Sequence, residues 1–156
     1  MSDGIMLAYL PTDGSWCKQP LPHLTLVYAG TLQDRNYSDF NQIAKDAILL
    51  TRVTPPFSLD VIGVEQFGDD DERVDVLTLS TTPELIRARE LVEYWNMSEH
   101  KEFNPHATVG PVGSARGVLP TKLYFDRIMV AFGNEDMVFR LSYDYADEGL
   151  SKASRY

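Results

Sequence analysis

The chain has 156 residues, of which 44% are hydrophobic and 24% are charged. This composition is typical of a globular protein, and the length suits one domain with one core. The formal net charge of −9 argues against a protein that holds long RNA or DNA by neutralising phosphates, and it favours a small substrate.

The amino-terminal segment and the cysteine content bear on location. Residues 1–14 have no basic region and only a short apolar run, so they do not resemble a signal peptide or a membrane span. Cys17 is the one cysteine, so it cannot form an internal disulfide, and we interpret it as a thiol without a special role. We therefore expect a cytoplasmic protein that does not associate with membranes.

The first third of the chain predicts two strands and a helix. Residues 4–10 form a short apolar run that ends at a proline, and residues 23–29 form a second run that ends at a glycine. Between residues 38 and 50 the apolar side chains recur at helical spacing, with Ser38 as the candidate N-cap.

The middle third predicts a hairpin followed by a second helix. Residues 57–67 and 74–80 have strand character and flank an acidic turn. The turn lacks the ligand spacing of a calcium loop, so we interpret it as a solvated turn. Thr82 then caps an amphipathic helix over residues 83–95, whose last residue, Trp95, we expect in the core.

The last third predicts three strands, at residues 106–110, 123–133 and 137–143. The tail over residues 147–156 has the composition of a flexible segment. No linker or repeat interrupts the order β-β-α-β-β-α-β-β-β, so we expect residues 1–146 to form a single domain. The predicted class is α+β, with antiparallel sheets in two similar, pseudo-symmetric halves and two flanking helices.

Each half contains a Pro-His-X-Thr segment, and this repeat is the main functional signal. Side chains alternate along a strand, so His23 and Thr25 share one face, and His106 and Thr108 share one face. If the two strands are neighbours, two imidazoles and two hydroxyls converge on one cleft.

Such a set of groups suits a phosphate. One imidazole takes a proton from the attacking oxygen while the other, protonated, donates a proton to the leaving oxygen; an unperturbed pKa of about 6.5 makes both forms available. The threonine hydroxyls can bind the non-bridging oxygens. A zinc site needs further ligands, for which only His100, Cys17 and scattered carboxylates remain. We expect neither a metal nor another cofactor.

The paired motifs and the order of the elements resemble the two-histidine phosphoesterase superfamily, which includes bacterial 2'-5' RNA ligase-like proteins. The resemblance covers nearly the whole chain. It implies a bilobal fold with a central groove, in which His23, Thr25, His106 and Thr108 are catalytic. It also implies action, without a metal, on 2',3'-cyclic phosphates, 2'-5' linkages or cyclic nucleotides.

Short members of that superfamily are also encoded by phages, where some degrade cyclic oligonucleotide signals of bacterial immunity. The connection between the first strand and the first motif is shorter here than in longer relatives. The resemblance thus implies a small nucleotide as substrate ahead of a large RNA.

Four further residues are weaker candidates for substrate binding. Tyr9 fits stacking on a base, contact with a phosphate, or core packing. Trp16 fits a platform for a base or packing of its loop. Arg116 lies in the glycine-rich segment 110–117, which can contact a phosphate but is more simply a flexible surface turn. Glu135, in the last turn, can orient a histidine or bind the edge of a base.

These features predict a metal-independent phosphodiesterase that acts on a small or cyclic nucleotide. One alternative is a module that binds such a nucleotide without turnover. Another is an enzyme of RNA ends, acting on 2',3'-cyclic phosphates or as a 2'-5' RNA ligase, and a third is a protein-interaction domain with incidental histidines. Base, linkage, oligomeric state and the division of roles between the histidines do not follow from the sequence.

Overall fold

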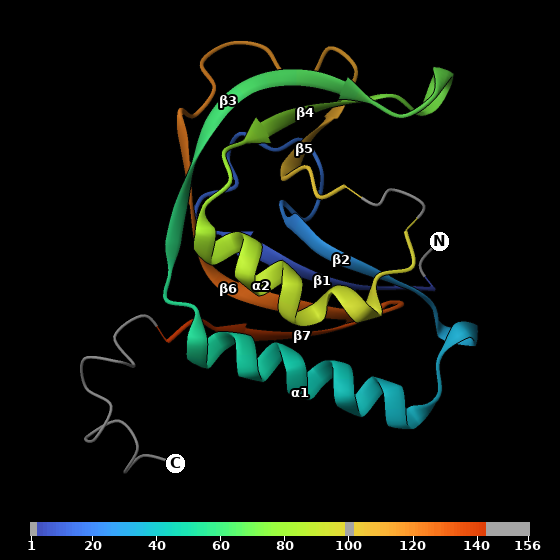
Figure 1. The fold of residues 1–156 in the computed structure, drawn as a ribbon. Coiled ribbons are helices and arrows are strands. Elements are labelled where there is room, and N and C mark those ends of the chain that lie inside the picture. Colours follow the sequence, from blue (N-terminus) through green and yellow to red (C-terminus); the bar gives the residue numbers. More distant parts are fainter. Residues whose placement is uncertain (1–2, 99–101, 143–156) are drawn as a thin grey trace.

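The computed structural model describes residues 3–98 and 102–142, and within them the elements follow in the predicted order (Figure 1). The strands and α-helices are β1 (Gly4–Pro11), β2 (Leu24–Thr31), α1 (Tyr37–Val53), β3 (Phe57–Phe67), β4 (Val74–Leu79), α2 (Pro83–Val92), β5 (His106–Pro111), β6 (Lys122–Phe132) and β7 (Glu135–Arg140). Short 3-10 turns cover Leu32–Asp34, Asp70–Glu72 and Glu93–Trp95.

The strands form one antiparallel sheet that closes on itself. The order is β1-β2-β5-β4-β3-β6-β7. Strand β1 also pairs with β6 along most of the length of β1, and this pairing closes the sheet. The sheet divides into a lobe of β1, β2, β6 and β7 and a lobe of β3, β4 and β5. Between β2 and β5 these lobes share a single registered pair, Leu24 with Ala107. The predicted bilobal α+β arrangement is thus confirmed, with both lobes belonging to one continuous sheet.

Helix α1 packs on β6 and β7, and α2 packs on β2 (Figure 1). The buried face of α1 includes Ile43, Ala47 and Leu50, which are spaced at i, i+4 and i+7 as an amphipathic helix requires. The N-cap of α1 is Asn36, and the prediction of Ser38 is wrong. Asn36 and Asp39 form a reciprocal capping box, in which each side chain accepts a backbone N–H of the other residue, at 2.9 Å and 3.2 Å.

Helix α2 begins as predicted. The hydroxyl of Thr82 accepts the backbone N–H of Leu85 at 3.2 Å, and Pro83 occupies the first helical turn, where its missing N–H has no cost. The helix ends three residues earlier than expected and continues as the 3-10 turn Glu93–Trp95. Trp95 is buried, as predicted.

One large core draws on both lobes and both helices. On the strands that carry the two motifs, core-facing side chains alternate with half-buried ones, as the period of a strand dictates. The core-facing set is Leu24, Leu26, Ala107 and Val109. The half-buried set is His23, Thr25, His106 and Thr108. Packing of the first set therefore orients the second set away from the core.

Three predictions fall wholly or partly outside the described residues: the solvated His100, the flexible tail over residues 147–156 and the extent of the domain, residues 1–146. They stay predictions. No helix in the described part of the chain is both long and apolar enough to cross a membrane.

Candidate active site

The two His-X-Thr motifs meet at the one point where β2 pairs with β5. Leu24 lies opposite Ala107 in antiparallel register. Continuing this register by one residue on each side places His23 opposite Thr108 and Thr25 opposite His106. Opposed residues in such a pair have Cβ atoms about 5 Å apart, and diagonal neighbours lie about 7–8 Å apart. Continued in this way, the register predicts that the two imidazoles are diagonal neighbours on one face, with a hydroxyl opposite each.

Both imidazoles are held in the same way. Nδ1 of His23 lies 2.8 Å from the carbonyl oxygen of Leu21, and Nδ1 of His106 lies 2.8 Å from that of Asn104. A carbonyl oxygen only accepts, so each Nδ1 carries a proton and donates it. Each Nε2 is therefore the nitrogen left for chemistry, as a base in the neutral ring or as an acid in the imidazolium.

The proline in each motif explains this shared geometry. Pro22 and Pro105 stand between each histidine and the carbonyl that anchors it. A proline fixes its own φ near −65° and confines the residue before it to extended conformations. The carbonyl two residues before each histidine is therefore held in place by the backbone. This gives a physical reason for the Pro-His-X-Thr pattern found in the sequence.

Contacts around Thr25 and His106 leave the hydroxyl and the ring accessible. The hydroxyl of Thr25 donates to the thioether sulfur of Met6 at 3.3 Å, a weak acceptor that a phosphate oxygen would displace. The ring of Phe67 meets the ring of His106 edge-on, with centroids 4.7 Å apart. That contact limits the rotation of His106 on one side.

A cavity of about 470 Å³ opens beside Thr25 and His106. This volume lies in the range of small-molecule sites. Its walls come from β2, from the end of β3 and from the segments on either side of residues 99–101. The lining includes Gln66, Phe67, Arg89, Asn96, Ser98, Glu102, Phe103 and Asn104.

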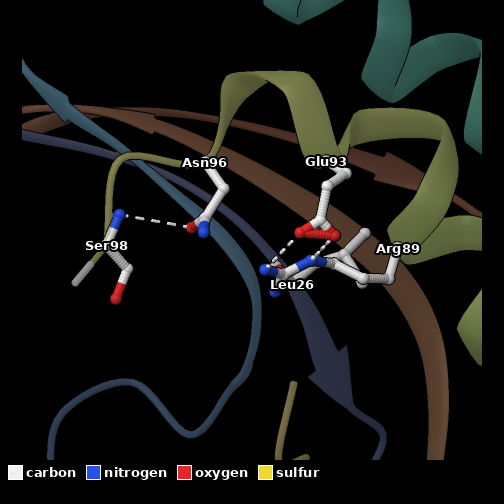
Figure 2. Close-up of polar contacts among 5 residues, drawn as sticks. All are labelled: Leu26, Arg89, Glu93, Asn96 and Ser98. Atoms are coloured by element: carbon white, nitrogen blue, oxygen red, sulfur yellow. Dashed lines mark hydrogen bonds and ion pairs between the residues drawn. The ribbon is translucent and has the colours of Figure 1, made fainter. Parts of the chain in front are cut away.

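Arg89 of α2 lies in the wall of this cavity, and sequence reasoning missed it. Its buried guanidinium binds both carboxylate oxygens of Glu93, at 3.0 Å and 3.1 Å, and donates to the carbonyl oxygen of Leu26 at 2.7 Å (Figure 2). It also lies 4.9 Å from the ring centroid of Phe103. The signal in the sequence was a lone arginine among the apolar positions of an amphipathic helix.

The same figure shows the segment that follows α2. The side-chain oxygen of Asn96 accepts the backbone N–H of Ser98 at 3.4 Å (Figure 2). Asn96 and Ser98 also line the cavity.

The structure places Tyr9 in the core, so its predicted contact with a base or a phosphate is wrong. The register pairs Tyr9 with Leu24, which brings its backbone beside the first motif, but its side chain is 0% exposed and packs edge-on against Phe57. Burial raises the pKa of the Tyr9 hydroxyl, and the nearby Thr54 side chain offsets only part of that rise. Among the described residues this hydroxyl has no hydrogen-bond partner of good geometry.

Trp16 and Arg116 also lie outside the cavity. Trp16 is buried and its indole N–H donates to the carbonyl of Asp13 at 2.7 Å, so it packs its own loop onto the core. Arg116 is exposed in a surface turn. That turn is not loose, because Asp75 accepts the backbone N–H groups of Gly113 and Ala115 at 2.8 Å and 3.1 Å.

Glu135 is not near the motifs, and the prediction that it orients a histidine or binds a base is wrong. It is the first residue of β7 and pairs with Phe132, which pairs in turn with Ile5. This end of the sheet adjoins Thr31, the last residue of β2, whereas His23 directly precedes the first residue of β2. Because a strand rises about 3.3 Å per residue, the whole length of β2 separates Glu135 from His23.

Titratable groups that commonly bind metals are dispersed in the described part of the chain. Within it, no three or more His, Cys, Asp or Glu side chains gather in a geometry that can hold a metal ion.

Comparison with solved structures identifies the fold. Usb1 of Kluyveromyces marxianus aligns with a TM-score of 0.64 at 10% identity, over 90% of this chain and 99% of its own. The protein TT0787 of Thermus thermophilus aligns with a TM-score of 0.60 at 15% identity, over 88% and 97%. LigT of E. coli, in a complex with 3'-AMP, aligns with a TM-score of 0.52 at 15% identity, over 91% and 97%.

This chain therefore shares its fold with these solved proteins. The fold that the sequence resemblance implied is confirmed. At sequence level no protein-family model matches the chain, and no curated protein matches it.

Proposed function

We propose that this protein is a phosphodiesterase that cleaves a phosphodiester or a cyclic phosphate in a small or cyclic nucleotide by acid–base catalysis with two histidines. The observation that carries the proposal is the crossing of the two His-X-Thr motifs, in which both imidazoles have the same Nδ1 anchor. Two solved neighbours add support, because their structures contain nucleotides: 3'-AMP in LigT and uridine monophosphate in Usb1.

In the proposed mechanism the phosphate lies between the diagonal imidazoles. Neutral Nε2 of one histidine takes the proton of the attacking hydroxyl or water as its oxygen bonds to phosphorus. Nε2–H of the other histidine, in its imidazolium form, donates a proton to the leaving oxygen as its bond to phosphorus breaks. The hydroxyls of Thr25 and Thr108 donate to the non-bridging oxygens, where negative charge builds up. The protons balance within this pair, so the steps require no metal.

Turnover of a panel of nucleotides tests the proposal. The panel holds 2',3'-cyclic mononucleotides, 2'-5' oligoadenylate, and cyclic di- and trinucleotides, with products separated by chromatography. We expect His23→Ala and His106→Ala each to lower kcat/KM by about 10²- to 10⁴-fold, and excess EDTA to change nothing. Thermal denaturation of each variant shows whether the fold is kept.

The pattern of products distinguishes the alternatives. Opening of 2',3'-cyclic ends or joining of 2'-5' linkages identifies an enzyme of RNA ends, and cleavage of cyclic oligonucleotides identifies an enzyme of nucleotide signals. A nucleotide that binds but is recovered unchanged indicates sequestration without turnover. Full activity in the double histidine variant would disprove the mechanism.

A further inference from the structure

Strand β7 has a free edge. It is the last strand in the order of the sheet, and among the described strands it pairs with β6 alone. Just after β7, the backbone N–H of Leu141 donates to the carbonyl oxygen of Asp126 on β6 at 2.9 Å. Backbone groups alternate in direction along a strand, so those of Asp136, Val138 and Arg140 point away from β6. These groups lie at an edge that no other described strand covers.

The side chains along this edge are exposed on both faces of the sheet. Met137 is 39% exposed and Val138 is 48% exposed. Asp136 and Arg140 are also exposed, and both lie on the same face as Val138 because side chains alternate along a strand. A free edge that carries exposed apolar side chains is a template for pairing with another strand. The edge of β7 therefore has the properties of an interaction surface.

Arg140 has no acidic partner in the described part of the chain. It lies opposite Arg127 of β6, and like charges in directly opposed positions repel. The guanidinium of Arg127 binds Asp126 and the carbonyl oxygen of Pro11, and neither contact neutralises Arg140. A strand that brings a carboxylate beside Arg140 would offset the repulsion.

A second copy of β7 supplies that carboxylate. Two identical antiparallel strands in one sheet are related by a two-fold axis perpendicular to the sheet, so opposed residues belong to the same face. A register centred on Val138 places Asp136 opposite Arg140 of the second copy, and Val138 opposite its own copy. The outward backbone groups of these three residues then pair across the axis. Registers centred on Asp136 or on Arg140 oppose like charges instead.

Helix α1 adds exposed apolar surface beside this edge. It packs on β6 and β7 (Figure 1), and its Asp46 binds Tyr94 and Trp95 on the side towards α2. Because an α-helix turns about 100° per residue, Tyr37 and Ile48 project from the opposite side of α1, towards the free edge. They are 83% and 37% exposed. The two-fold axis places both copies of α1 on the same side of the joined sheet.

We propose that β7 pairs with β7 of a second copy in the register centred on Val138, which joins the two sheets in a symmetric dimer. The ion pair between Asp136 and Arg140 then forms twice, once on each side of the axis. The dimer is weak and depends on concentration, because each copy contributes an edge of only six residues. This pairing is independent of the proposed catalysis, since the described lining of the cavity includes no residue of β7.

Sedimentation equilibrium over a range of protein concentrations tests the dimer. We expect the wild type to interconvert between monomer and dimer. Asp136→Arg and Arg140→Asp should each raise the Kd of the dimer at least about tenfold, because each replaces two ion pairs with two repulsive pairs. The double variant, which carries both changes, restores the ion pairs in reverse order and should bring the Kd back to within about threefold of the wild type.

Mixing the two single variants gives a second test of the register. One single variant then offers two arginines and the other offers two aspartates, so the mixture should form a dimer that neither forms alone. The matched control is Glu135→Arg, which makes the same change of charge at the neighbouring exposed residue. Glu135 has no charged residue opposite it in this register, so the Kd of the control should stay within about threefold.

Thermal denaturation shows whether each variant folds. If a charge variant does not fold, Val138→Lys decides, because it places two lysines opposite each other at the axis and should abolish the dimer. A wild type that stays monomeric at every concentration overturns the proposal, whether the edge is bare or covers itself with another segment. A dimer that tolerates both charge reversals uses another surface and overturns it as well.

Discussion

At the scale of single residues, each imidazole is set by backbone groups close to it in sequence. The carbonyl that fixes Nδ1 lies two residues before the histidine, and a proline stands between them. In the part of the chain that the structure describes, each Nδ1 contacts a backbone carbonyl and not a carboxylate. The surroundings of the two rings differ, because His106 contacts Phe67 and lines the cavity.

The hydroxyl of Thr25 provides a test at this scale. Thr25→Val removes the donor and keeps the shape, so we expect kcat to fall by roughly 10- to 100-fold because one preorganised donor to the phosphate is lost. Thr25→Ser keeps the hydroxyl and should retain most activity. Steady-state kinetics on any substrate that the panel identifies checks both variants. Equal activity of the valine and serine variants would show that the hydroxyl does not act on the phosphate.

Strand periodicity was enough to predict which side chains of the motifs share a face. It was not enough for Tyr9 or Glu135, because membership of a site depends on which strand ends meet and on which face is covered. The side chain of Tyr9 points into the core although its backbone adjoins Leu24. Nothing local in the sequence distinguishes that outcome from an exposed groove position.

At the scale of elements, Arg89 connects α2 to the strand that carries the first motif. Its guanidinium bonds to the backbone of β2 at Leu26, next to Thr25, and to Glu93 in the turn after α2. Because the carbonyl of Leu26 is thereby satisfied, α2 can cover β2 without leaving a buried acceptor unpaired.

We expect Arg89→Leu to lower the free energy of unfolding by about 1–3 kcal/mol, since the buried carbonyl of Leu26 loses its donor. Glu93 is half exposed, so water can solvate its carboxylate and limit the loss. Arg89→Lys keeps the charge with fewer donors and should have an intermediate effect. Urea denaturation of the wild type, Arg89→Leu and Arg89→Lys measures the free energy of unfolding of each. Arg87→Leu, an exposed arginine on the same helix, is the control, and an equal loss in both leucine variants would contradict the role of Arg89.

The position of most elements followed from local signals, and their ends were less accurate. Thr82 and Pro83 mark the start of α2 correctly, because a capping hydroxyl and a first-turn proline act within a few residues. Ser38 was mistaken for a cap because Asn36 and Asp39 form a reciprocal pair, which competes successfully with a single hydroxyl. Long-range pairings such as β1 with β6 have no local signal at all.

At the scale of the whole molecule, contacts between elements far apart in the sequence hold the parts of the fold together. The carboxylate of Asp46 on α1 accepts the hydroxyl of Tyr94 and the indole N–H of Trp95, which follow α2. The guanidinium of Arg35 stacks on Trp95 and donates to its carbonyl at 3.0 Å. These contacts lie just before Asn96 and so fix the chain where it enters the wall of the cavity.

The buried hydroxyl of Tyr9 makes the stability of the folded protein depend on pH in the alkaline range. Burial raises the pKa of Tyr9 above its ordinary value of 10.0. Since the folded pKa is raised, the unfolded chain loses this proton first as the pH passes 10, and the folded state is increasingly disfavoured. We expect Tyr9→Phe to flatten the decline in the free energy of unfolding above pH 10, by up to about 1.4 kcal/mol per pH unit.

At neutral pH the same variant should be unchanged or more stable, because the hydroxyl that it removes is buried without a good partner. Urea denaturation between pH 7 and pH 11 measures both effects. Tyr124→Phe, at a half-exposed position of β6, is the matched control and should leave the alkaline decline as it is. A decline in Tyr9→Phe as steep as in the wild type would mean that Tyr9 ionises alike in the folded and unfolded chains, which full burial of its hydroxyl does not allow.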